Sequence, residues 1–105
     1  MRWIILSDRE VEEIFGAKDR IRELEVMVKA TSRLPIEDTL VVCKPFRTRF
    51  YYYLAFRVPS NTPCDTVKKE AGRIVGWLRR FVRVSHYLSF APMWRRGFMI
   101  PIEVQ

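Results

Sequence analysis

The amino-acid sequence predicts a single α+β domain over residues 1–105. Three patterns predict this class: a β-branched and aromatic hairpin over 39–58, a short helix with start and stop signals over 7–16, and a long amphipathic segment over 62–82. The length of 105 residues is that of one ordinary domain. A hydrophobic share of 49% is enough for a packed core, which excludes wholesale disorder.

The N-terminal segment predicts a strand followed by a short helix. The apolar run Trp3–Leu6 is typical of a short buried strand. Ser7 follows as a candidate N-cap, and Glu10 stands three residues later, which is the spacing of a capping box. Gly16 comes directly after the apolar residues of this helix, where a C-terminal glycine is expected.

Residues 17–31 fit two different elements. Apolar residues recur at helical spacing at Ala17, Ile21, Leu24 and Val28. Apolar residues also alternate at strand spacing at Leu24, Val26, Val28 and Ala30. Because Gly16 is a stop signal, we expect the first helix to end there and a strand to run over 22–30.

The middle and end of the chain predict a hairpin, a helix and two closing strands. The strands Thr39–Lys44 and Arg49–Val58 are joined by a turn over 45–48, and closing strands are expected near Tyr87–Phe90 and Phe98–Val104. The helix between them begins within 62–65 and ends at 81–82. Its apolar arc contains Val67, Ala71, Ile74, Val75, Trp77, Leu78, Phe81 and Val82. We therefore expect Trp77 to be substantially buried. The opposite face is basic and consists of Lys68, Lys69, Arg73, Arg79, Arg80 and Arg83.

With a strand at 22–30, the element order resembles that of the ASCH domain, a member of the PUA-like group of small β-barrels. The similar segments are Trp3–Leu6, Val11–Phe15, Gly16-Ala17-Lys18, Glu37-Asp38, Cys43-Lys44-Pro45, Tyr52–Val58 and Gly97–Val104. The resemblance implies a small PUA-like (ASCH-like) β-barrel with two helices. The family's G-x-K motif is degenerate here, and Ile21 stands where members that act as small amidohydrolases carry threonine.

A ferredoxin-like βαββαβ domain is the alternative fold, and it includes the RNA-recognition-motif type. In that case one long first helix would replace the short helix and the strand at 22–30. The segment Arg49–Phe56 fits part of that module's aromatic third-strand pattern, although Phe50 and Tyr52 replace its two small residues.

The charge distribution and both folds point to a nucleic-acid partner. Residues 1–38 carry 7 basic against 9 acidic residues, whereas residues 39–105 carry 12 against 3. A basic region with interleaved aromatic residues is typical of surfaces that bind RNA or single-stranded nucleic acid. Tyr51 and Tyr53 share one strand face, and Phe50 and Tyr52 share the other. The candidate binding residues are Lys18, Arg20, Arg22, Lys44, Arg47, Arg49, Tyr51 and Tyr53.

Two other functions remain open. A small nucleobase-directed hydrolase or nuclease of the ASCH type would use Lys18 beside Glu23 or Glu25 as an acid–base pair, but we assign no catalytic residues. A viral or mobile-element protein-interaction module, with a second copy of this chain as one partner, would use Trp3, Trp77 and Trp94 as interface anchors.

Cofactor and membrane signals are scarce. His86, Cys43 and Cys64 supply only three soft ligands without C-x-x-C spacing, so we expect no metal and no cofactor. Both cysteines are expected to stay as thiols. The N-terminal apolar run is shorter than a secretory signal requires, and no apolar run is long enough to span a membrane, so we expect a cytoplasmic protein.

Overall fold

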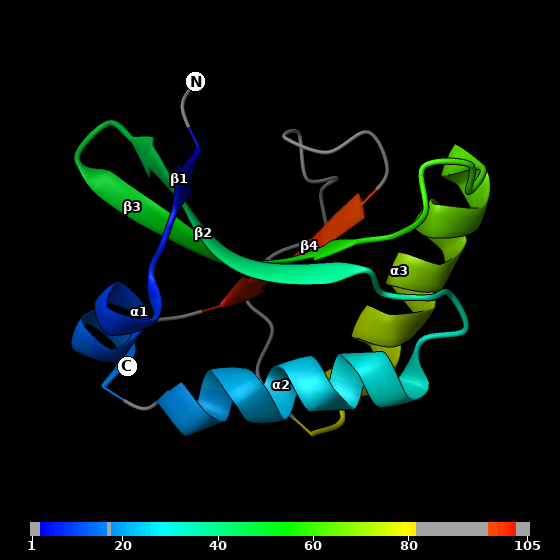
Figure 1. Ribbon diagram of the computed structural model, residues 1–105, viewed down its shortest axis with the longest axis horizontal. Coiled ribbons are helices and arrows are strands. Elements are labelled where there is room, and N and C mark those ends of the chain that lie inside the picture. Colours follow the sequence, from blue (N-terminus) through cyan, green and yellow to red (C-terminus); the bar gives the residue numbers. More distant parts are fainter. Residues whose placement is uncertain (1–2, 17, 82–96, 103–105) are drawn as a thin grey trace.

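A computed structural model describes residues 3–16, 18–81 and 97–102, without the side chains of Lys18 and Asp19 (Figure 1). The described elements are three helices and four strands. In chain order they are β1 (Ile4–Ile5), α1 (Asp8–Phe15), α2 (Lys18–Thr31), β2 (Asp38–Phe46), β3 (Arg49–Arg57), α3 (Cys64–Leu78) and β4 (Gly97–Ile102). The predicted α+β class is confirmed.

The four strands form one antiparallel sheet in the order β1-β2-β3-β4. Every strand pairs with its neighbour in the chain. In the described part of the chain this sheet is open, so the expected barrel with two helices is not observed. The alternative fold is not observed either, because a ferredoxin-like domain pairs strands that are not neighbours in sequence.

The start and stop signals of the first helix are confirmed. The Ser7 hydroxyl accepts a hydrogen bond from the Glu10 amide at 3.2 Å, and the Glu10 carboxylate accepts one from the Ser7 amide at 3.1 Å. Gly16 ends the helix in the left-handed region at φ 66°. The expectation of a buried first strand is wrong, because β1 is a two-residue edge strand in which Ile4 and Ile5 are 40% and 53% exposed.

The expected strand at 22–30 is also wrong, since α2 covers this segment. The helical face of the pattern is the one that packs: Ile21, Leu24 and Val28 contact the core. Val26, which a buried strand would have covered, is 64% exposed. Lys29 and Glu25 form an ion pair at 2.9 Å, the i,i+4 spacing that supports a helix.

The predicted hairpin is confirmed as β2 and β3, which pair continuously from Asp38↔Arg57 to Phe46↔Arg49. The turn is tighter than expected. It consists of Arg47 and Thr48 alone, because both strands extend to the residues beside them. Arg47 has a φ of 58°, a left-handed conformation that is typical of two-residue hairpin loops.

α3 packs its apolar side on the sheet, with Val67, Ile74 and Leu78 fully buried. It ends before the predicted range, at Leu78. Trp77 is only partly buried against the core, and Phe81 is 61% exposed, so the expected burial of Trp77 is confirmed only in part.

A partly buried ion pair within α3 fastens this helix to the end of α2. The Glu70 carboxylate accepts hydrogen bonds from Arg73 at 2.6 and 2.8 Å and from the Arg33 amide. Arg73 also donates to the carbonyl of Thr31, the last residue of α2. Arg73 was expected on the basic face of the helix. Instead it donates to a carbonyl at the C-terminal end of α2, where the last carbonyl groups have no hydrogen-bond partner within the helix.

The helices cover one face of the sheet, named here the helix face (Figure 1). This face carries Val41, Leu54, Phe56, Phe98 and Ile100, which form the main core with the helices. The other face, named here the second face, carries a smaller buried cluster of Val42, Ala55 and Met99. The predicted strand at 98–104 is observed as β4, and the strand near 87–90 lies outside the described residues.

Candidate nucleic-acid interface

The hairpin brings five of the eight predicted binding residues to one end of the sheet. In the register of β2 and β3, Lys44 lies opposite Tyr51 and Val42 lies opposite Tyr53. Because residues paired across strands share a face, Lys44, Arg49, Tyr51 and Tyr53 all project from the second face. Arg47 stands at the loop beside them. We name this surface the hairpin face: Trp3, Lys44, Phe46, Arg47, Arg49, Tyr51 and Tyr53.

Aromatic rings and cations alternate on the hairpin face. Trp3 and Tyr53 meet edge to face, with ring centroids 5.5 Å apart. The Lys44 Nζ lies 5.2 Å from the centroid of the Trp3 ring. Nearer the turn, the Phe46 and Tyr51 centroids are 6.4 Å apart, and the Arg47 guanidinium carbon lies 5.4 Å from the Phe46 ring. The rings therefore offer π surfaces with a positive charge beside each pair.

The inner end of the hairpin face is anchored in packed structure. Trp3 and Tyr53 lie against the cluster of Val42, Ala55 and Met99, which are at most 1% exposed. Exposure increases toward the turn, where Phe46 is 41% exposed. The hairpin face thus combines a fixed base with an accessible tip. Because the base is already ordered, binding a nucleic-acid strand costs less conformational entropy of the protein.

No carboxylate of the hairpin neutralises these cations. The sequence has no acidic residue between Asp38 and Asp65, while Lys44, Arg47, Arg49 and Arg57 lie in that interval. Among the ion pairs of the described residues, none involves Lys44, Arg47 or Arg49. Within the part of the chain that the structure describes, a polyanion can therefore approach Lys44, Arg47 and Arg49 without displacing a carboxylate.

The remaining predicted residues lie elsewhere. Arg20 and Arg22 are exposed residues of α2, which packs on the helix face, whereas the tyrosines project from the second face. Lys18 begins α2, and its side chain lies outside the described residues. The structure therefore does not join the cluster at 18–22 to the hairpin residues.

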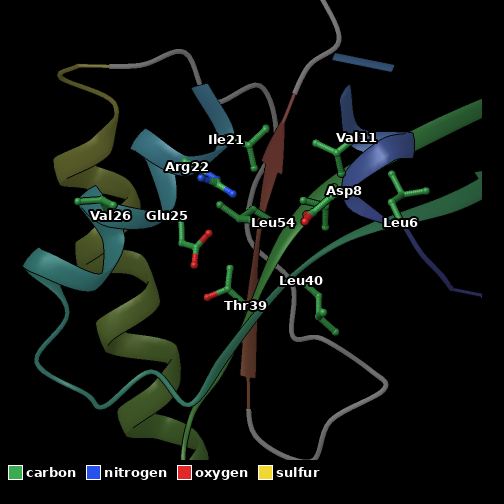
Figure 2. Close-up of a pocket in the computed structure, with 11 residues that line it drawn as sticks. Leu6, Asp8, Val11, Ile21, Arg22, Glu25, Val26, Thr39, Leu40 and Leu54 are labelled. Carbon is green, nitrogen blue, oxygen red and sulfur yellow. The ribbon is translucent and has the colours of Figure 1, made fainter. Parts of the chain in front are cut away.

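Arg22 lines a cavity of about 440 Å³ between α1, α2 and β2. Figure 2 shows the polar ends of Asp8, Arg22, Glu25 and Thr39 turned toward this space, above a floor that includes Leu54. The Thr39 Oγ1 is buried and has no hydrogen-bond partner among the residues that the structure describes. Glu25 pairs with Lys29, and Glu23 is exposed. The Lys18 side chain, which the expected acid–base pair of a hydrolase also needs, lies outside the described residues.

Sequence reasoning missed two residues of the hairpin face, Trp3 and Phe46. Phe46 was placed in the turn, but it is the last residue of β2 and pairs with Arg49. The signal that could have found it is strand alternation, because Val42, Lys44 and Phe46 follow one another at intervals of two residues. Trp3 could not be found this way, since the pairing of β1 with β2 is not a local feature.

The thiol groups lie in different surroundings. Cys43 and Cys64 are both free; Cys43 is buried in β2 and Cys64 is exposed at the start of α3. Burial raises the pKa of the Cys43 thiol, which keeps it protonated and unreactive. Burial also raises the pKa of Tyr52, with a smaller contribution from Cys43 opposite it. No metal-binding group of three or more His, Cys, Asp or Glu residues occurs in the described ranges.

The comparisons with known proteins give no relative. No protein-family model matches the chain, and neither a curated protein nor a solved structure matches it. Over the residues that the structure describes, no helix has the length and apolar character needed to cross a membrane.

Proposed function

We propose that this protein binds single-stranded nucleic acid, RNA in the first place, on the hairpin face. The observation that carries the proposal is the arrangement of Trp3, Phe46, Tyr51 and Tyr53 with three cations that have no acidic partner among the described residues. Aromatic side chains stack on unpaired bases, and lysine and arginine bind phosphates without reading sequence. The contact would form in the cytoplasm, as the sequence leads us to expect.

The hydrolase alternative has weaker support. The only carboxylates in the described cavity lining are Asp8 and Glu25, and Glu25 is neutralised by Lys29. The resemblance to the ASCH domain stays a hypothesis. The proposed function does not depend on it, because the hairpin face is built from strand register alone.

Fluorescence polarisation with labelled RNA and DNA strands at several salt concentrations tests the proposal. Log affinity should fall linearly with log salt, with a slope of about −0.7 per phosphate contacted. Replacing Arg47 and Arg49 together by Ala should make the slope shallower by one to two contacts and weaken all sequences alike. Tyr51→Ala should cost about 1–3 kcal/mol and leave the slope nearly unchanged, because stacking releases no counterions.

The matched control replaces Lys68 and Lys69 by Ala. Both residues are exposed on α3. Replacing them removes the same amount of charge as the hairpin variant does, but at a site away from the hairpin face. The proposal fails if this control weakens binding as much as the hairpin variant does. It also fails if neither RNA nor DNA binds more tightly than about 100 μM at low salt, which is the weak limit of sequence-independent binding.

A further inference from the structure

The tip of the hairpin exposes aromatic residues on both of its faces. Phe46 is on the second face, while Phe50, which is 59% exposed, is on the helix face. On the helix face, the Tyr52 ring packs against Phe15 of α1, with ring centroids 5.2 Å apart. In Figure 1 the loop between β2 and β3 lies apart from the three helices. The last residues of the hairpin therefore stand clear of the core on either side.

A single nucleic-acid strand on the hairpin face leaves Phe50 unexplained. Phe50 projects away from Tyr51 and Tyr53, because neighbouring residues of a strand point to opposite faces. It follows Arg47 and Arg49 in the chain, and no acidic residue lies between Asp38 and Asp65. An exposed aromatic ring at the tip of a basic hairpin fits a second run of bases rather than a second copy of this chain, which would bring arginine toward arginine.

We infer that the hairpin tip inserts between the two strands of a nucleic acid where pairing ends. This inference rests on the proposed function, and it names the substrate as a junction between paired and unpaired segments. One strand leaves across Phe46 and Tyr51, and the terminal base of the other stacks on Phe50. Apolar side chains are used in this way as wedges between base steps.

The geometry of the turn supports insertion. Arg47 and Thr48 alone join the strands, so the tip is narrow: it consists of two paired strands about 4.8 Å apart and a two-residue loop. Arg47 and Arg49 are exposed beside Phe46, on the side of the tip away from Phe50, and can hold the phosphates of the strand that leaves across Phe46.

The test compares three labelled probes: a forked duplex with two unpaired arms, the blunt duplex, and the single strand of one arm. The wild-type protein should bind the fork about tenfold more tightly than the single strand, the effect of one further stacked base. Phe50→Ala should lose this preference and keep the single-strand affinity, whereas Phe46→Ala should weaken both. A 2-aminopurine in the terminal base pair should brighten with the wild type and not with Phe50→Ala.

Phe81→Ala is the matched control, because Phe81 is 61% exposed and lies beyond α3. It should bind all three probes like the wild type, and thermal unfolding should show that every variant is folded. Equal affinity of the wild type for fork and single strand overturns the inference and leaves the proposed function standing. If none of the three probes binds, both the inference and the proposed function are overturned. Self-association that Phe50→Ala abolishes, measured by sedimentation, overturns the inference in favour of a contact between copies.

Discussion

Arg47 holds a backbone conformation that no other non-glycine residue adopts in the described part of the chain. Its φ is 58°, in the left-handed region, which costs a residue with a Cβ about 1–2 kcal/mol. Two-residue hairpin loops usually place glycine, asparagine or aspartate there. An arginine in this position thus sacrifices stability at an exposed tip, which is a reason to look for a function of its side chain.

Replacing Arg47 by Gly should separate the two roles of this residue. Stability should be unchanged or higher by up to about 1 kcal/mol, because the strain is relieved while the unfolded chain gains freedom. Affinity for nucleic acid should fall, since a phosphate contact is lost. Urea unfolding and fluorescence polarisation measure the two quantities. Thr48→Gly is the control, and it should keep the affinity. Unchanged affinity in Arg47→Gly would contradict the assigned role.

At the scale of elements, α2 shows where sequence reasoning stopped. Leu24 and Val28 belong to both the helical and the alternating pattern, so the two differ only at Ala17 and Ile21 on one side and Val26 and Ala30 on the other. The structure packs Ile21 against the core and leaves Val26 64% exposed. Gly16 was interpreted correctly as a stop, but a stop does not say whether the next element is a strand or a second helix. That choice depends on the helix face of the sheet, which needs α2 as a cover.

The clamp between α2 and α3 leads to a prediction for Glu70. Its carboxylate is 7% exposed and paired with Arg73, so Glu70→Gln should destabilise the fold by about 1–3 kcal/mol. Glu13→Gln is the control: the Arg9–Glu13 pair has the same kind of partner, but its side chains are 89% and 65% exposed. Denaturant unfolding should show a loss of less than about 1 kcal/mol there. Equal losses for the two variants would contradict the burial argument.

The same clamp makes stability depend on pH. The hydrogen bonds from Arg73, more than any other cause, hold the pKa of Glu70 below the ordinary 4.5. The unfolded state therefore binds this proton more readily, and the contribution of the pair is complete at neutral pH. It should be lost as the pH falls below about 4.5 and through the lower pKa of the folded state. The difference in unfolding free energy between wild type and Glu70→Gln should shrink over this range, and a constant difference would contradict it.

For the whole molecule, the hairpin face could be predicted largely from strand alternation and its charge. Which side of its strand each residue points to follows from alternation along the strand, which is a local property. The pairing of β2 with β3 then places Lys44, Arg49, Tyr51 and Tyr53 on one surface. Grouping Arg20 and Arg22 with that surface depended on the wrong element at 22–30 and on a closed barrel. The packing side of a helix is not local information, which is why the sequence could place the hairpin residues and not the α2 arginines.

The order of strands in the sheet has a kinetic consequence. β2 and β3 close over two loop residues, and a hairpin of this kind forms in about 1–10 μs. β4 joins the sheet only after the chain returns from Arg57 to Gly97, which demands the ordering of a long loop that includes α3. Contacts within the hairpin should therefore precede the β3–β4 contacts in the folding transition state. In stopped-flow experiments Val42→Ala should mainly slow refolding, whereas Ile100→Val should mainly accelerate unfolding.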